Sequence, residues 1–507
     1  MTVRVGDGWR AFVTELGRAG VDVREDRASR AVFATDAGGL VHGLAHGVVA
    51  PRSADDVAAV LRAAQRHLVP VTVRGGGLTT EGESVAVGGC LLNMASMNRV
   101  GAVDVERRTA RVEAGIYWHT LGEHLRRYGL DYVSAPLNFT SSVGGTLGVG
   151  GIDMNSCNEG CCADQAIALR VVTPTGEIVD CSERQHPELF ERVLLGYGQY
   201  GVIVEATLRV RPYTPIALQY WFYSSLRTAT EDLIALVRAQ VADYAGILTV
   251  NDRGVTLLVA FDSEPRQRTF DETWAPGLRG RTQTAFVAAM ALHFAVRPWR
   301  WREAAGMARR ARGILPELHR PEHRQDGKIL DRSVVFSRAV WKHWGQRRMV
   351  IPDLATSEGK IIEAVERGAA VCRRFFPVFS LYIVATRIQA GRTRYELSCI
   401  PTDAEDWAYG CSFEPRFEAD EYSSDHLQRF KEAIYDVGLE LGTTYYRFGG
   451  AMRGYIRRAL GDAIVDKYSA LKRAVDPGMI LNPHVLFGPA DRGEPAVEHV
   501  RRGTMQR

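Results

Sequence analysis

Two glycine-rich segments carry the residue types and spacing that most clearly indicate chemistry. The first reads Gly-Gly-Gly-Leu-Thr-Thr over residues 75–80 and directly follows the β-branched run 70–74. The second reads Ser-Ser-Val-Gly-Gly-Thr-Leu-Gly-Val-Gly-Gly over residues 141–151. A diphosphate is held by several converging backbone N–H groups, and glycine allows the chain to approach it closely. We therefore expect both segments to be turns that grip the diphosphate of a dinucleotide.

Neither segment identifies a cofactor by itself. Neither contains the lysine of a P-loop, and neither fits G-x-G-x-x-G with an acidic residue downstream. Taken singly, each could equally be a tight turn. Their occurrence as a pair, each in strand-rich surroundings, favours the dinucleotide interpretation.

A few polar side chains are candidates for a base or a proton carrier beside such a cofactor. Tyr445 and Tyr446 lie in a predicted strand, in which alternate side chains face opposite sides, so only one of them can face a pocket. Tyr382 lies in another predicted strand, and Asp153 and Glu159 flank the second glycine segment. For each tyrosine the alternative is a buried structural role. For each carboxylate the alternative is a solvated or turn-capping position.

A cysteine cluster and a basic stretch are weaker candidates. Cys157, Cys161 and Cys162 form a C-x3-C-C cluster, but tetrahedral zinc normally takes four ligands from two such pairs, so we expect no metal here. A packed loop is the simple alternative, and a redox-active thiol pair stays open. Residues 286–312, rich in Arg and Trp, could bind a membrane surface or a partner, or could cover a domain with solvated arginines.

Composition limits the class of protein. A chain of 507 residues predicts two or more domains. A content of 46% hydrophobic and 24% charged residues is ordinary for a folded protein. A net charge of +4 gives no case for nucleic-acid binding. The longest apolar run, residues 285–296, is too short to span a bilayer, and no secretory segment is recognised, so we expect a cytoplasmic protein.

The elements that must position these residues follow from hydrophobic periodicity. Strands are predicted at 48–50, 70–74, 90–92, 166–172, 177–181 and 202–210, with two more between 100 and 114. Helices are predicted after a Ser53–Asp56 cap and at 118–127. After Pro212 the pattern changes to strands such as 247–250, 255–260 and 379–386 between long helices, which indicates a second domain. Residues 455–474 predict a last helix.

Four motifs occur in an order that resembles a known family. They read VTVRGGG at 71–77, VGGTL at 143–147, GQYGVI at 198–203 and DPGMILNP at 476–483. This order resembles the FAD domain of the vanillyl-alcohol oxidase / p-cresol methylhydroxylase superfamily. Within that superfamily the sequence is most similar to cytokinin dehydrogenases. The shared pattern covers roughly residues 45–212 and 455–488.

The resemblance implies an α+β fold: a two-subdomain FAD-binding domain of p-cresol methylhydroxylase type with an inserted α+β substrate domain, whose antiparallel sheet is covered by helices. The implied boundaries are 1–212 and 455–490 for the FAD-binding domain, 213–454 for the inserted domain and 491–507 for a flexible tail. The implied cofactor-binding residues are Arg74, Gly75, Gly76, Gly77, Leu78, Thr79, Thr80, Pro136, Ser141, Ser142, Gly144, Gly145, Thr146, Gly148, Gly151, Gly201, Ile203, Asn482 and His484.

Two departures from the family pattern matter. The positions of the family's flavin-linking His and of its relatives' linking Cys fall at Leu78 and Asn138, so non-covalent FAD is implied. The catalytic Asp of cytokinin dehydrogenases falls at Leu137, and residues 134–140 contain no carboxylate. This argues against cytokinin as the substrate.

The resemblance therefore implies an FAD-dependent oxidase or dehydrogenase that oxidises a C–N or C–O bond of a small metabolite, in secondary metabolism, by hydride transfer to flavin N5. O2 or another acceptor would reoxidise the flavin, and Gly150 and Gly151 would leave room for O2. The alternative is a non-redox flavin protein, either a cyclase or a degenerate binding protein, because the usual base is missing. The oligomeric state, including a homodimer, stays open.

Overall fold

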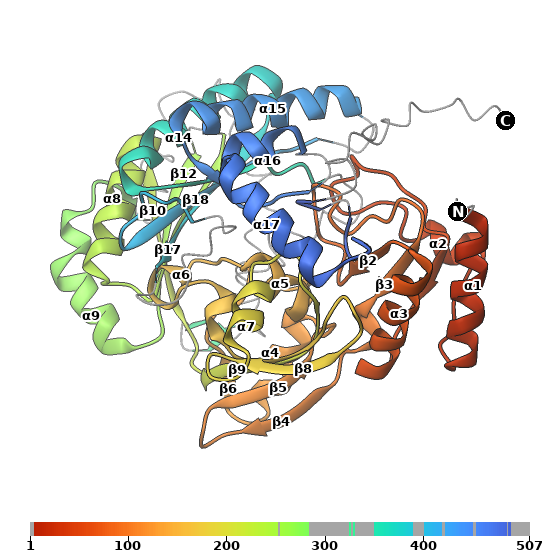
Figure 1. Ribbon diagram of the computed structural model, residues 1–507. Helices are drawn as coiled ribbons and strands as arrows, with labels where there is room; N and C mark the ends of the chain where they lie inside the picture. Colours follow the sequence, from red (N-terminus) through yellow and green to blue (C-terminus); the bar gives the residue numbers. More distant parts are fainter. Residues whose placement is uncertain are drawn as a thin grey trace.

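The computed structural model describes residues 5–251, 254–282, 324–325, 328–329, 349–388, 400–417, 421–449, 453–483 and 485–487. These residues form an α+β molecule built on three principal sheets, with most of the helices on its outside (Figure 1). The Arg- and Trp-rich stretch 286–312, His484 and the tail 491–507 lie outside the described residues.

A small parallel sheet organises the N-terminal part. Its order is β1-β3-β2, and its elements are β1 (Gly47–Val49), β2 (Val71–Arg74), β3 (Cys90–Asn93), α1 (Val5–Arg18), α2 (Arg27–Ala31), α3 (Ala54–His67) and the 3-10 turn η1 (Met94–Ser96). The two outer strands β1 and β2 both pair in parallel with the central β3, and α3 connects β1 to β2. The predicted cap is confirmed, because Ser53 Oγ accepts the N–H of Asp56 at 3.1 Å.

A second, antiparallel sheet follows. Its strand path is β4-β5-β9-β7-β8, with β6 paired to β9, and the members are β4 (Val100–Asp104), β5 (Thr109–Glu113), β6 (Leu130–Tyr132), β7 (Ala166–Val172), β8 (Ile178–Ser182) and β9 (Val202–Pro212). The strands predicted here are confirmed to within a few residues. Its connecting elements are α4 (Trp118–Arg126), α5 (Val143–Val149), α6 (Ser156–Glu159), η2 (Cys162–Gln165) and α7 (Pro187–Val193).

The middle of the chain builds a third sheet, whose strand pairs among the described residues are antiparallel. Its order there is β13-β10-β12-β11-β17-β18-β16-β19. The strands are β10 (Ala217–Tyr223), β11 (Tyr244–Val250), β12 (Gly254–Phe261), β13 (Arg281–Thr282), β16 (Asp353–Thr356), β17 (Phe379–Arg387), β18 (Trp407–Pro415) and β19 (Thr444–Tyr445), with a separate pair β14 (Arg324–Gln325) and β15 (Lys328–Ile329). The accompanying helices are α8 (Leu226–Ala239), α9 (Glu264–Thr273), the turn η3 (Ala275–Gly277), α14 (Glu358–Phe375) and α15 (Ser424–Leu441).

Helices α8, α14 and α15 lie on the outer side of this sheet (Figure 1). A Cβ on Gly438 of α15 would lie 2.7 Å from Leu354, and one on Gly368 of α14 would lie 2.1 Å from the Phe413 ring. Leu354 and Phe413 therefore face the helices. Because successive strand residues alternate, Asp353 and Glu414 face the other way, toward the rest of the molecule.

The C-terminal part returns to the first sheet through α16 (Arg453–Leu460) and α17 (Asp462–Val475). The single helix predicted over 455–474 is interrupted at Gly461, whose φ is +82°. Beyond α17 the chain runs beside β2, where Val71 N–H donates to the Ile480 carbonyl and Asn482 N–H donates to the Val71 carbonyl, both at 2.8 Å. The fully buried Lys472 ammonium donates to the carbonyls of Gln199 and Leu481, at 2.6 and 2.9 Å.

One prediction was wrong in kind. The second glycine segment is not a turn after a strand, because residues 143–149 form helix α5 with Ser142 at its N-cap. Gly150 and Gly151 then end this helix with φ of +115° and +72°, which a residue without Cβ adopts readily. Two glycines side by side within α5 lower its intrinsic propensity, so its packing must hold it.

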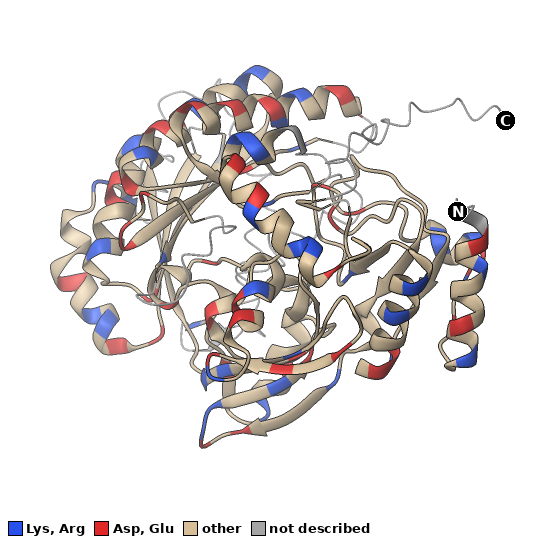
Figure 2. Ribbon diagram, in the orientation of Figure 1, with Lys and Arg blue, Asp and Glu red and all other residues tan. Residues whose placement is uncertain are grey.

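Lys and Arg positions are interspersed with Asp and Glu positions along the outer helices (Figure 2). No helix that the structure describes combines the length and the apolar character that a membrane crossing requires.

Candidate functional site

The two glycine segments lie in direct contact. A Cβ on Gly75 would lie 2.0 Å from Ser142 Oγ, and one on Gly76 would lie 3.0 Å from the Thr140 carbonyl. Gly77 has a φ of +68°, which places its backbone in the left-handed region. The absence of side chains is therefore what lets these two segments pack together, although Gly75 and Ser142 lie 67 positions apart in the sequence.

The backbone amides of the second segment are partly used by the protein itself. Val143 N–H donates to the Ile116 carbonyl at 2.8 Å, and Gly144 N–H donates to the Ala114 carbonyl at 2.7 Å. Those two amides cannot also grip a phosphate. A Cβ on Gly148, by contrast, would have nothing packed against it within 4 Å. The second segment therefore contributes mainly open space beside its glycines. It does not present all of its backbone N–H groups to a ligand.

A cavity of about 310 Å³ lies between the glycine segments and the open face of the third sheet. Most predicted cofactor-binding residues line it. They are Gly75, Gly76, Gly77, Leu78, Thr79, Pro136, Ser141, Ser142, Gly144, Gly145, Thr146, Gly148, Gly151, Gly201, Ile203 and Asn482. The glycine-rich wall leaves room for a large planar or diphosphate-bearing group, so the residues present fit FAD.

Two predicted cofactor-binding residues are not among the cavity's lining residues. Arg74 Nη1 donates to the carbonyls of Thr35 and Ser84, at 3.0 and 3.3 Å, so its guanidinium supports the first glycine loop from behind. Thr80 is buried, and its hydroxyl accepts from Arg447 at 3.4 Å. Arg74 and Thr80 therefore contact the residues around the first glycine loop and do not line the cavity itself.

The third and fourth motifs meet at one edge of the cavity. Asn482 donates through Nδ2 to the Gly198 carbonyl at 2.7 Å, and its Oδ1 accepts the N–H of Val73 at 2.8 Å. Tyr197 N–H donates to the Gly148 carbonyl at 2.9 Å. Asn482 therefore joins β2, the 197–198 turn and, through that turn, the end of α5. A single side chain thus connects the first motif to the last, 409 positions away.

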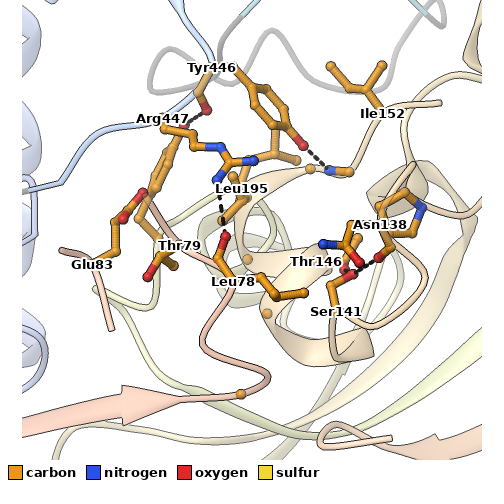
Figure 3. Close-up of a pocket in the computed structure, with 18 of the residues that line it drawn as sticks. Leu78, Thr79, Glu83, Asn138, Ser141, Thr146, Ile152, Leu195, Tyr446 and Arg447 are labelled. Atoms are coloured by element: carbon orange, nitrogen blue, oxygen red, sulfur yellow. Dashed lines mark hydrogen bonds between the residues drawn. The ribbon is translucent and has the colours of Figure 1, made fainter. Parts of the chain in front are cut away.

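Tyr446 and Tyr445 face opposite sides, as strand geometry predicts. Tyr446 lines the cavity, and its hydroxyl accepts the N–H of Gly151 at 3.0 Å (Figure 3). Tyr445 is fully buried on the helix side, where its hydroxyl donates to the Tyr435 carbonyl of α15 at 2.7 Å. The structural alternative thus holds for Tyr445. The predicted strand is shorter than expected, since β19 ends at Tyr445.

Tyr382 lines the cavity from β17, together with Thr386. Both side chains are buried, and neither hydroxyl has a hydrogen-bond partner in the part of the chain that the structure describes. Burial raises the pKa of Tyr382 well above its usual range. Tyr382 is therefore a neutral hydroxyl available to a molecule in the cavity.

Asp153 and Glu159 do not line the cavity. Asp153 is buried, and its Oδ1 accepts the N–H groups of Asn155 and Ser156, at 2.5 and 3.2 Å. This is the turn-capping role that was the alternative for this carboxylate. Glu159 ends the short helix α6, and its carbonyl accepts from Gln165 at 2.9 Å.

Four charged residues of the cavity wall were not predicted: Glu83, Asp353, Glu414 and Arg447. Arg447 Nη1 donates to the Leu78 carbonyl at 3.3 Å (Figure 3), and its Nε lies 3.4 Å from Asp353 Oδ2. Burial raises the pKa of Asp353 to about 6 and that of Glu414 to about 7. Burial, reinforced by Glu81 and Asp36, raises the pKa of Glu83 to about 7.

A signal for Glu414 was present in the sequence. In 407–415 small or polar residues at 408, 410, 412 and 414 alternate with the large or apolar residues at 407, 409, 411 and 413. This period of two is typical of a strand with one open face. The alternation does not say what that face opposes, which is why the carboxylate was missed.

The three cysteines lie on a buried segment: Cys157 is in α6, Cys162 begins η2, and Cys161 between them also lines the cavity. Cys157, Cys161 and Cys162 are all buried, and burial raises the pKa of each thiol. Cys157 donates through its thiol to the Met154 carbonyl at 3.2 Å. Among the described residues no three His, Cys, Asp or Glu side chains come together in a way that could hold a metal ion.

Comparisons with known proteins bear on this cavity. Residues 45–182 match the family model described as an FAD binding domain. The chain is 35% identical over 211 residues to an uncharacterized oxidoreductase of the fasciation locus of Rhodococcoides fascians, covering 41% of this chain and 48% of that protein. It is 32% identical over 257 residues to cytokinin dehydrogenase 2 of Oryza sativa, covering 46% and 45%.

A third relative has a name that states a different activity. The chain is 34% identical over 170 residues to the mitochondrial D-lactate dehydrogenase (cytochrome) of Arabidopsis thaliana, covering 32% of this chain and 30% of that protein. The chain thus matches about half, or less, of the length of these relatives. Residues 45–182 thus match an FAD binding domain, and the similarity to named oxidoreductases and dehydrogenases extends over about half of the chain or less.

Proposed function

We propose that this protein is an FAD-dependent oxidoreductase that oxidises a C–N or C–O bond of a small molecule in the cavity between the glycine segments and the third sheet. The observation that carries the proposal is the contact of Gly75 with Ser142. It brings both glycine segments to one wall of the cavity, within a region that matches an FAD binding domain.

The glycine wall would hold FAD without a covalent bond. Gly75–Leu78 from the first segment and Ser142–Gly148 from the second would lie along it, and Asn482 would close one edge. Leu78 and Asn138 both line the cavity, and neither side chain can form the links found in relatives. Bound FAD would accept a hydride from the substrate, and O2 or another acceptor would then reoxidise it.

The opposite wall would position the substrate and accept its proton. Leu137 lines the cavity in the place where a carboxylate was expected. Glu414 supplies a carboxylate from the facing sheet, and its pKa of about 7 suits a base near neutral pH. The Tyr446 hydroxyl, held by Gly151 N–H, would orient the substrate between the two walls.

Flavin analysis of the purified protein tests the cofactor. The protein should be yellow, and acid precipitation should leave free FAD in the supernatant. A protein that is colourless and takes up no FAD on reconstitution would overturn the proposal. Flavin that stays in the acid pellet would contradict non-covalent binding alone.

Anaerobic mixing with panels of small amines and alcohols tests the chemistry. Bleaching of the flavin absorbance by one of them would support oxidation. Product formation with an unchanged flavin spectrum would instead support the non-redox alternative, which the missing carboxylate at Leu137 favours. At a saturating concentration of the same compound, the Glu414→Gln variant should bleach at least about tenfold more slowly. Removing a general base usually costs at least this much in rate.

A further inference from the structure

In the part of the chain that the structure describes, acidic side chains outnumber basic ones in the cavity, and two of the three acidic residues, Asp353 and Glu414, lie on the wall that the third sheet forms. Of the described residues that line the cavity, Glu83, Asp353 and Glu414 are acidic, and Arg447 alone is basic. Arg447 lies against Asp353 and near Glu83. The wall itself therefore has more carboxylates than cations.

The charges that act on Glu414 come from its own strand and from its neighbours. Arg416 and Arg447 favour its ionised form, and Asp353 opposes it. Tyr382 of β17 pairs with Ser412, two residues before Glu414 on β18, so its side chain lies on the same face of the sheet. Burial outweighs the two cations, because the pKa of Glu414 is raised and not lowered.

The same wall contains two hydroxyls that lack partners among the described residues. Tyr382 and Thr386 are 7% and 4% exposed, and both line the cavity from one face of β17. In the pairing register Tyr382 lies opposite Ser412, which in turn lies opposite Asp353. Buried hydroxyls without partners are costly, and a polar ligand would satisfy them.

Several apolar side chains also line the cavity. Val384, Ile152, Leu195, Met349 and Ile351 all line it. A ligand that matches the wall therefore has a compact polar end among the carboxylates and an apolar body beside these side chains.

Resting on the proposed function, we infer that the substrate carries a protonated amine, held by Glu414 and Asp353 with the Tyr382 hydroxyl, on an apolar body. An ammonium group has three N–H donors and no acceptor. It can donate to two carboxylates and to the hydroxyl oxygen of Tyr382. It also supplies the positive charge that the wall lacks.

This arrangement makes amine binding depend on pH in a defined direction. The carboxyls must be ionised to hold an ammonium ion, and an alkylammonium of Lys type keeps its proton up to a pKa near 10.4. A carboxyl with a pKa of about 7, such as Glu414, is about one-eleventh ionised at pH 6 and about ten-elevenths at pH 8. Amine affinity should therefore rise about tenfold from pH 6 to pH 8.

Calorimetric titration of the purified full chain, with its flavin, tests this inference. The probes are benzylamine and benzyl alcohol, which share an apolar body and differ in the charged group. Benzylamine should bind at least about tenfold more tightly than benzyl alcohol at pH 8. Its affinity should fall on acidification to pH 6, while that of the alcohol should stay constant.

Variants locate the effect. Glu414→Gln should lower benzylamine affinity at pH 8 about tenfold and flatten its pH dependence, with benzyl alcohol unaffected. Glu358→Gln is the matched control, because Glu358 lies at the start of α14, pairs with Arg238 and does not line the cavity. This control should bind both probes as the unmodified protein does. The pH comparison in the unmodified protein applies even if Glu414→Gln fails to fold.

The outcomes separate this inference from the proposed function. Equal binding of the two probes, or an amine preference that survives in Glu414→Gln together with Asp353→Asn, would overturn the inference. A protein that contains FAD and is bleached by alcohols but by no amine would overturn it while leaving the oxidoreductase proposal intact. A protein without FAD that still prefers the amine would contradict the proposed function alone.

Discussion

The two walls of the cavity are built by different means. The glycine wall uses backbone and the absence of side chains, in short contiguous motifs at 75–78 and 142–148. The sheet wall uses side chains that come from three separate strands, such as Asp353, Tyr382 and Glu414. A backbone site needs glycine at particular places and so leaves a local pattern. A side-chain site on a sheet needs only the right residue on the right face.

The junction between the walls should give the largest effect on stability. Lys431 of α15 and Glu81 of the loop after the first glycine segment form a fully buried ion pair, and the Tyr435 hydroxyl donates to Glu81 at 2.9 Å. Lys431→Met leaves Glu81 buried without its cation, so we expect a loss of about 3–5 kcal/mol in the free energy of unfolding. Urea denaturation measures it.

The control for this junction is the double variant Glu81→Gln/Lys431→Met, which removes both charges. It should recover most of the lost stability, because no isolated charge then stays buried. A single variant as stable as the unmodified protein would show that the pair does not join the walls energetically.

The glycine wall should be broken by one side chain. Gly75→Val places atoms where Ser142 Oγ now lies, and overpacking of this kind costs roughly 1–3 kcal/mol. Because it forces the two segments apart, we expect FAD affinity to fall at least about tenfold, or roughly 1.4 kcal/mol, as measured by flavin absorbance after gel filtration. Gly17→Ala, where nothing lies within 4 Å, should keep its FAD. Full flavin content in Gly75→Val would refute the contact.

The adjacent residues Tyr445 and Tyr446 test the two sides of the sheet separately, because Tyr445 faces the helices and Tyr446 faces the cavity. Tyr445→Phe removes a buried donor to the Tyr435 carbonyl, so the free energy of unfolding should drop by about 1 kcal/mol. Tyr446→Phe removes a hydroxyl of the cavity and should change FAD affinity or probe binding more than stability. Chemical denaturation and flavin titration of both variants provide the test. If Tyr445→Phe changed ligand binding and Tyr446→Phe changed stability, Tyr445 would be the residue that faces the cavity.

The smallest effect is electrostatic. In the protein without an added amine, burial raises the pKa of Glu414 from 4.5 to about 7. The folded state therefore holds more protons than the unfolded state between these values, so stability falls as pH rises through that window. Between pH 6 and pH 8, ionisation of this carboxyl should lower the free energy of unfolding by about 1 kcal/mol. The Glu414→Gln variant should lack this contribution to the pH dependence of stability. The prediction would be contradicted if the free energy of unfolding changed by the same amount between pH 6 and pH 8 in the unmodified protein and in Glu414→Gln.

Much of the glycine wall and its supporting strands could be predicted. The motif order placed Gly75, Ser142 and Asn482 together, and the structure brings all three to one cavity. The strand prediction also allowed only one of Tyr445 and Tyr446 to face a pocket. Asp153 and Glu159 were candidates because they are close in sequence to the second segment. Proximity along the chain was misleading there, because neither residue lines the cavity: Asp153 caps the turn at 155–156, and Glu159 ends α6.

What the sequence alone determined is the cofactor end of the molecule. Glycines in series, β-branched strands and a returning C-terminal motif are local patterns, and each has a local physical cause. Only the tertiary structure shows which side chains line the cavity opposite the glycine segments. Asp353 and Glu414 lie 61 positions apart in the sequence, and they share one face because β16 and β18 pair in a single register. Glu83 and Arg447 reach the same cavity from the loop after the first glycine segment and from the residues after β19. A shift of one residue in either strand would turn its carboxylate into the helix layer. The alternation within 407–415 indicates which residues share a face, but it does not say what that face opposes.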